Sequence, residues 1–271
     1  MKKWTISALV YLFVIVGGYY VYASFTEPES HNDTNAPHKQ EAESSHGQDH
    51  QEDGNNHDGE SEVIPNIQVE NGELIITLND LAGNPVSDLE VNHEKLMHLI
   101  VVSTDFKEYQ HLHPQTNEPG VFKVAHSLPA GEYKAFVDIK PTGKAYEVAP
   151  ISFMVGENHT EHEKDSLTVD TELTKEAGGH SVKLYPSSLK VNEDIQLKFD
   201  LAGDTPELYL GALGHVVILD ERGENYVHVH PLEGNEPVFA TKFSEPGIYK
   251  IWAEFKFNGQ VYVYPYVVEI K

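Results

Sequence analysis

The chain has 271 residues and a formal net charge of −24, from 43 acidic and 19 basic residues. A charge of this size repels nucleic acid and anionic membrane surfaces, and it attracts cations. The chain contains no cysteine, which excludes disulfides, thiolate metal sites and cysteine nucleophiles.

The first segment predicts a membrane anchor. Met1, Lys2 and Lys3 precede an uncharged, mostly apolar run at residues 4–23, and about 20 such residues span the hydrocarbon of a bilayer. Basic residues before the run indicate a cytoplasmic N-terminus. We therefore expect residues 1–25 to form a single-pass anchor, with the remainder of the chain outside the cytoplasm. The alternative is a signal peptide cleaved near Ala23, which would give a secreted protein.

Residues 26–62 are polar and acidic, with very few aliphatic side chains. Such a composition buries too little apolar surface to offset the entropy of ordering, so this tail is expected to be disordered. It could be a solvated tether, or a weak collector of divalent metal ions, and the two interpretations are compatible. The collector would use five histidines: His31, His38, His46, His50 and His57.

The remaining sequence contains the same pattern twice. DLAG occurs at 80–83 and again at 200–203, and PAGEYKAFVDIK at 129–140 matches EPGIYKIWAEFK at 245–256. Matches in the same order over some 100 residues indicate an internal duplication.

Each copy consists of short strand-like runs separated by turn residues, with little helical periodicity. This pattern is typical of an antiparallel β-sandwich of the immunoglobulin-like kind. We expect an all-β protein with tandem sandwiches at residues 63–156 and 166–271, joined by a polar linker at 157–165.

The histidine motif lies in the duplicated part. MHLIVVSTDFKEYQHLHP at 97–114 aligns without a gap with GHVVILDERGENYVHVHP at 214–231. Each stretch predicts a strand, a turn and a second strand, which places the first histidine opposite the last and all three on one face. Three neutral imidazoles at that spacing suit a copper or zinc ion. The expected ligands are His98, His111 and His113 in the first copy and His215, His228 and His230 in the second.

A fourth ligand could be water or, in the first copy, Met97, His93 or His126. The second copy has Gly214 in place of Met97, so only the first copy offers a thioether that would suit Cu(I). The alternative is that the repeated histidines are structural, hydrogen-bonded to backbone carbonyls and preserved with the packing of each copy.

Catalysis is not expected from this sequence. It has no GxSxG motif, no phosphate-binding glycine loop and no HExxH motif, and no glutamate adjoins the HxH pairs as a general base.

Three stretches of the second copy are similar to a known group of proteins. PSSLKVNEDIQLKFDLAG (186–203), GALGHVVILDERGENYVHVHP (211–231) and PGIYKIWAEF (246–255) resemble bacterial exported β-sandwich proteins of the YtkA-like and FixH-like kind. Some of these carry an HxHP element and accompany copper-handling genes. The resemblance covers most of residues 63–271 and is looser in the first copy, which lacks a clear PxxLKVxE start. It implies an exported immunoglobulin-like fold with a role in metal handling.

Two functions are consistent with these observations. The first is a membrane-anchored, extracytoplasmic protein that buffers or sequesters copper or zinc, or delivers it to a membrane transporter. The second is a metal-independent surface module, in which the tandem sandwiches present a face to a partner protein or a cell-wall polymer.

Overall fold

The computed structural model describes residues 60–156 and 166–271 apart from residue 228, all within one compact unit that begins at Asp53. The expected anchor at 1–25, nearly all of the tail and the linker at 157–165 lie outside the described residues. Within the described part, no helix is long and apolar enough to cross a membrane.

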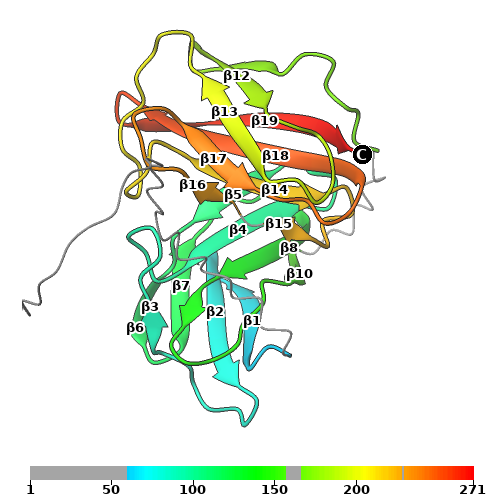
Figure 1. The fold of residues 1–271 in the computed structure, drawn as a ribbon. Coiled ribbons are helices and arrows are strands. Elements are labelled where there is room, and N and C mark those ends of the chain that lie inside the picture. The colour runs from blue at the N-terminus through cyan, green and yellow to red at the C-terminus, as the bar shows by residue number, and fades with distance from the viewer. Residues whose placement is uncertain (1–59, 157–165, 228) are drawn as a thin grey trace, which may run out of the picture. The chain divides into compact units, whose positions relative to one another are not determined.

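The first copy consists of two four-stranded antiparallel sheets, ordered β1-β2-β7-β6 and β10-β8-β4-β5 (Figure 1). A short pair, β3-β9, lies beside them. The strands are β1 (Val63–Glu70), β2 (Glu73–Asp80), β3 (Leu89–Glu90), β4 (His98–Ser103), β5 (Tyr109–Leu112), β6 (Gln115–Glu118), β7 (Val121–Ala125), β8 (Gly131–Asp138), β9 (Lys140–Pro141) and β10 (Pro150–Val155).

The second copy repeats this order with one added edge strand. Its sheets are β11-β12-β13-β17-β16 and β15-β14-β18-β19. The strands are β11 (Thr174–Ala177), β12 (His180–Pro186), β13 (Ile195–Asp200), β14 (His215–Asp220), β15 (Tyr226–Val227), β16 (His230–Pro231), β17 (Val238–Thr241), β18 (Gly247–Phe257) and β19 (Gln260–Ile270).

This strand order is that of an immunoglobulin-like sandwich, and a second feature supports the assignment. A tyrosine near the start of the equivalent strands β8 and β18 turns its hydroxyl back to a carbonyl four residues upstream. The Tyr133 hydroxyl donates to the Pro129 oxygen at 2.9 Å, and the Tyr249 hydroxyl donates to the Glu245 oxygen at 2.8 Å. Such tyrosine corners are typical of the fold. The prediction of an all-β protein with two repeated sandwiches is confirmed.

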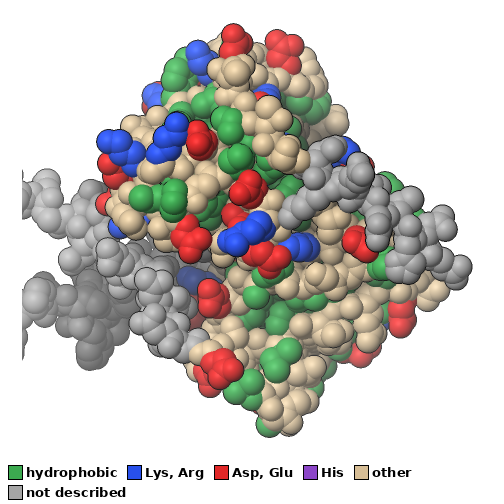
Figure 2. All heavy atoms as spheres, turned by 90° about the vertical axis from the view of Figure 1, so that its right-hand side faces the viewer, with side chains coloured by type: hydrophobic (Ala, Val, Ile, Leu, Met, Phe, Trp, Pro, Cys, Tyr) green, Lys and Arg blue, Asp and Glu red, His purple; other side chains and the backbone are tan. Residues whose placement is uncertain are grey.

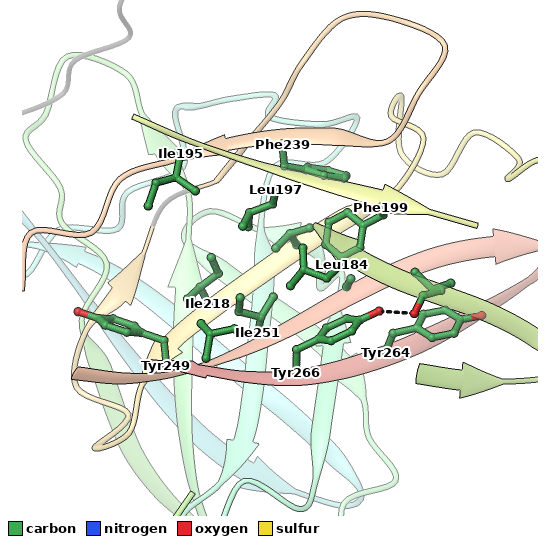
Figure 3. Packing of buried hydrophobic residues seen from close by; sticks show 14 of the residues in the cluster. Leu184, Ile195, Leu197, Phe199, Ile218, Phe239, Tyr249, Ile251, Tyr264 and Tyr266 are labelled. Atoms are coloured by element: carbon green, nitrogen blue, oxygen red, sulfur yellow. Dashed lines mark hydrogen bonds between the residues drawn. The ribbon is translucent and has the colours of Figure 1, made fainter. Parts of the chain in front are cut away.

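Each copy has its own hydrophobic core, built by alternation along the strands. In β13, Ile195, Leu197 and Phe199 are buried while the residues between them are exposed. These side chains meet Ile251 and Tyr266 from the facing sheet (Figure 3). Each fully buried side chain of this size contributes about 1.5–3 kcal/mol.

Strands β4 and β14 depart from alternation, because all six residues of each are buried. Residues such as Leu99 on one face of β4 pack in the core of the first copy, whereas Ile100 on the other face belongs to a third cluster. That cluster also contains Val217, Leu219 and Trp252 of the second copy. The two copies therefore pack against each other through the outer faces of equivalent strands.

The contacts at this interface obey an approximate twofold relation. Tyr109 stacks on Trp252 with ring centres 4.9 Å apart, and the equivalent Tyr226 stacks on Phe136 at 5.8 Å. Phe136 and Trp252 themselves occupy equivalent positions in β8 and β18. The face of each hairpin that carries the histidines is consequently the face turned toward the other copy.

Candidate metal centre

The first hairpin brings its three histidines together as the sequence predicts. Strand β4 pairs with β5 so that Ile100 lies opposite His111 and Leu99 opposite Leu112. The same register puts His98 opposite His113, one residue beyond β5. The ring centres of the three histidines are 4.7 to 5.2 Å apart. One ligand nitrogen from each lies within 4.8 Å of the others, so this triad could hold a metal ion.

Hydrogen bonds fix which nitrogens of the triad are free. His98 Nε2 lies 3.0 Å from the carbonyl oxygen of Asn92, and His111 Nδ1 lies 2.6 Å from Oε2 of Glu254. Both partners accept, so these two ring nitrogens carry the hydrogens. His98 Nδ1 and His111 Nε2 are left with lone pairs, and they face each other at 2.9 Å. Two facing lone pairs repel unless a proton or a metal ion lies between them.

His113 provides the third donor. Its Nε2 is buried and has no hydrogen-bond partner among the described residues. Nearly all buried polar groups in proteins are hydrogen-bonded, and one that is not requires a reason such as an ion. A cation bound by the facing nitrogens of His98 and His111 would satisfy this atom as well.

The surroundings of His113 and His98 favour the neutral form of their imidazoles. Burial, together with the neighbouring His111 and His98, lowers the pKa of His113 to about 3. Burial also lowers the pKa of His98. The neutral ring is the form that binds a metal ion. At neutral pH, protons therefore compete only weakly with the ion for these ring nitrogens.

Glu254 was not foreseen from the sequence. It lies in β18 of the second copy, where the register places it opposite His215, and it is only 3% exposed. Its carboxylate nevertheless accepts a hydrogen bond from His111 of the first copy. The available signal was an acidic residue at the same place in the two equivalent strands, Asp138 in β8 and Glu254 in β18.

His215 joins the same cluster and does not form a distant site. Its Nε2 lies 2.9 Å from the carbonyl oxygen of Tyr209, which reproduces the bond between His98 and Asn92. Its ring centre is 5.8 Å from that of His111 and 5.5 Å from that of His93. Burial lowers its pKa to about 3.

His230 does not follow its counterpart His113. The β14–β15 pairing ends at Val227, and the chain then crosses to the other sheet, where His230 pairs with Ala240. His230 is exposed there. His228 lies outside the described residues. A second triad equivalent to the first is thus not found among the histidines that the structure describes.

The other proposed ligands are distributed as follows. Met97 is fully buried in the core of the first copy, on the face of the strand opposite to His98. His126 accepts a hydrogen bond from the Leu128 amide at 3.2 Å and has no ring contact with the cluster among those described. His93 does belong to the cluster. The tail histidines His31, His38, His46, His50 and His57 lie outside the described residues. The face drawn in Figure 2 shows no histidine among the described residues.

A comparison with known protein families finds both copies of the duplicated domain. The model of a family described as "Domain of unknown function (DUF8832)" matches residues 61–156 and again residues 175–271. No curated protein matches the chain. One solved structure, titled "Anomalous substructure of Titin-A168169", is similar at 10% identity over 78% of this chain and 96% of that chain, with a TM-score of 0.19. A similarity this low carries no argument.

Proposed function

The chain belongs to the family of domains of unknown function (DUF8832), and from its histidine site we propose that it is an extracytoplasmic metal-binding protein for copper or zinc. The proposal rests mainly on the two lone-pair nitrogens of His98 and His111, which face each other at 2.9 Å. Metal–nitrogen bonds of about 2.0–2.1 Å allow one ion to bridge them with little movement of either ring.

The donor chemistry favours a transition metal. The triad offers only imidazole nitrogens, which suit copper and zinc, whereas calcium and magnesium prefer oxygen ligands. The carboxylate of Glu254 accepts a hydrogen bond from Nδ1 of His111, which is the ring nitrogen that would not bind the ion. A histidine ligand that is held by a carboxylate in this way is oriented and made more basic.

The number of ligands favours an exchangeable ion. Structural zinc sites are closed by four protein ligands, whereas the described triad supplies three. The remaining coordination position would accept water or a ligand from a receiving protein. We propose that the role is buffering, sequestration or delivery of the ion to a membrane transporter.

The cellular location is part of the same proposal. The two lysines and the apolar run at 4–23 support a single-pass anchor with both sandwiches outside the cytoplasm, and secretion after cleavage near Ala23 is the alternative. The histidine-rich tail would collect ions weakly near the folded site. The resemblance to YtkA-like and FixH-like proteins supports copper.

Metal titration tests this function. The full chain, with its five tail histidines replaced by asparagine, should bind Cu(II) or Zn(II) tightly by calorimetry. Replacing His111 and His113 with asparagine should abolish the tightest site, whereas His126→Asn should leave it unchanged. If the parent chain binds neither ion tightly, the metal function is wrong and the metal-independent surface module is favoured.

A further inference from the structure

A small cavity lies beside the triad, between the two copies. Its volume is about 40 Å³, and roughly 10–15 Å³ of such volume accommodates one water molecule. An ion with one or two waters therefore fits. The polar residues that line it are Asn92, His93, His98, His111, Asp138, His215 and Tyr226.

The position of the cavity follows the twofold relation between the copies. His215, Tyr226 and Pro231 line it, and they are the counterparts of His98, Tyr109 and Pro114 around the triad. Asp138 lies opposite His98 in the β4–β8 pairing, as Glu254 lies opposite His215 in the β14–β18 pairing. The cavity thus lies between the triad, of which His98 and His111 line it, and His215, the counterpart of His98 in the second copy.

Four imidazoles line this space, and two of them, His93 and His215, lie outside the triad. The Nε2 of His215 is occupied by the carbonyl oxygen of Tyr209, which leaves Nδ1 with a lone pair. The ring centres of His93 and His215 are 5.5 Å apart. Two imidazoles that share one ion with bonds of about 2.0–2.1 Å have ring centres roughly 5–6 Å apart.

We propose that His93 and His215 hold a second transition-metal ion of the copper or zinc class in this cavity, with the carboxylate of Asp138 beside it. One oxygen of Asp138 accepts a hydrogen bond from the Tyr226 hydroxyl at 3.2 Å. Its negative charge favours a cation, as the charge of Glu254 does at the triad. The proposal rests on the proposed function of the triad, and it extends that function to a two-ion centre.

The second position takes one histidine from each copy. His93 lies in a turn with a φ of 45°, and its counterpart Leu210 has a φ of 51°. The turn is therefore the same in both copies, but only the first copy places a histidine in it. His93 supplies an imidazole at this position, whereas His230 pairs with Ala240 in the other sheet. With two nitrogens in place of three, this position should bind more weakly than the triad.

A route to solvent adjoins the cavity. His93 and Pro231 also line a groove of about 290 Å³ whose other walls include Leu208 and Leu232. An ion could reach the second position through this groove without separation of the two copies.

The experiment counts ions in the full chain with asparagine at the five tail positions. Cu(II) or Zn(II) is added in excess, weakly bound ion is removed by gel filtration, and elemental analysis and calorimetry give stoichiometry and affinity. The expected parent value is two ions per chain, one tight and one weaker. His93→Leu should remove the weaker ion without unfolding, because leucine already occupies this turn in the second copy. Asp138→Asn should weaken it about 10–100-fold.

A variant of the triad separates the two sites. His113→Asn should weaken binding of the tight ion while the weaker one remains, because His113 does not line the cavity, and His126→Asn should change neither. If the parent chain binds one ion and His93→Leu does not change that binding, the proposed second position is wrong, while the proposed function of the triad is unaffected. No bound ion in the parent would overturn both proposals. Circular dichroism and thermal unfolding confirm that each variant is folded.

Discussion

The Nδ1–H of His111 in the first copy donates to the carboxylate of Glu254 in the second copy at 2.6 Å, and both side chains are only 4% exposed. A ligand of one sandwich is thus oriented by the other. Under the proposed function, metal affinity of the first copy should therefore depend on its packing against the second, and by linkage a bound ion should stabilise that packing.

Replacing Glu254 with glutamine tests this dependence. Glutamine keeps the size of the side chain but removes the charge that holds the His111 ring. Affinity for Cu(II) or Zn(II) should fall about 10–100-fold, the usual loss when a partner of a metal-bound histidine is changed. Calorimetry on the chain lacking tail histidines provides the measurement, and Glu172→Gln on the exposed surface is the matched control. Equal affinities in both variants would contradict the orienting role.

Met97 offers a test of whether sulfur takes part in the site. Because its side chain is buried in the core, Met97→Leu should leave Cu(I) affinity unchanged within a factor of about two. A volume-conserving exchange of this kind should cost less than about 1.5 kcal/mol in the free energy of unfolding. Competition with a chromogenic Cu(I) chelator measures the affinity. A tenfold loss of Cu(I) binding without loss of stability would show that the thioether is a ligand.

The gap-free alignment of the two histidine stretches was sufficient to predict the register of the first hairpin. Because side chains alternate strictly along a strand, that register determined which face carries His98, His111 and His113. The alignment could not show what covers this face, since docking of the copies depends on shape and not on strand periodicity. Glu254, His93 and His215 approach the triad only through that docking. His230 was misplaced because the second copy crosses between sheets earlier than the first, a loop difference without a clear sequence signal.

The two equivalent tyrosines at the interface should respond differently to loss of their hydroxyls. The Tyr226 hydroxyl donates to Asp138 at 3.2 Å, whereas the buried Tyr109 hydroxyl lies near the carboxylate of Glu254 without a hydrogen bond of good geometry among the described residues. Tyr226→Phe should therefore lower the free energy of unfolding by about 1 kcal/mol, and Tyr109→Phe should lower it by less. Urea denaturation of the metal-free chain compares the pair, each serving as the control for the other. Equal losses in both variants would show that the Tyr109 hydroxyl is also bonded.

The metal-free protein should lose stability as the pH falls below about 6.5. Burial holds the pKa of His113 and of His215 at about 3 in the folded protein, against about 6.5 for an ordinary histidine. Above pH 6.5 both residues are neutral in the folded and unfolded states, so their contribution does not change. Between pH 6.5 and 3 the unfolded chain takes up protons that the folded protein excludes. The unfolding constant should then rise by up to about tenfold per pH unit for each residue.

Urea denaturation in the presence of EDTA at pH 7.5, 6.0 and 5.0 measures this slope. Buried carboxylates such as Asp105 and Asp220 have a lowered pKa, so their contribution is lost only below about pH 4 and does not enter this window. Replacing His113 and His215 with asparagine should make the slope shallower, whereas His180→Asn, away from the cluster beside Asp204, should not. A stability that stays constant from pH 7.5 to 5.0 in the parent would mean that these imidazoles already carry protons in the folded protein, and the neutral, metal-ready state of the site would then be wrong.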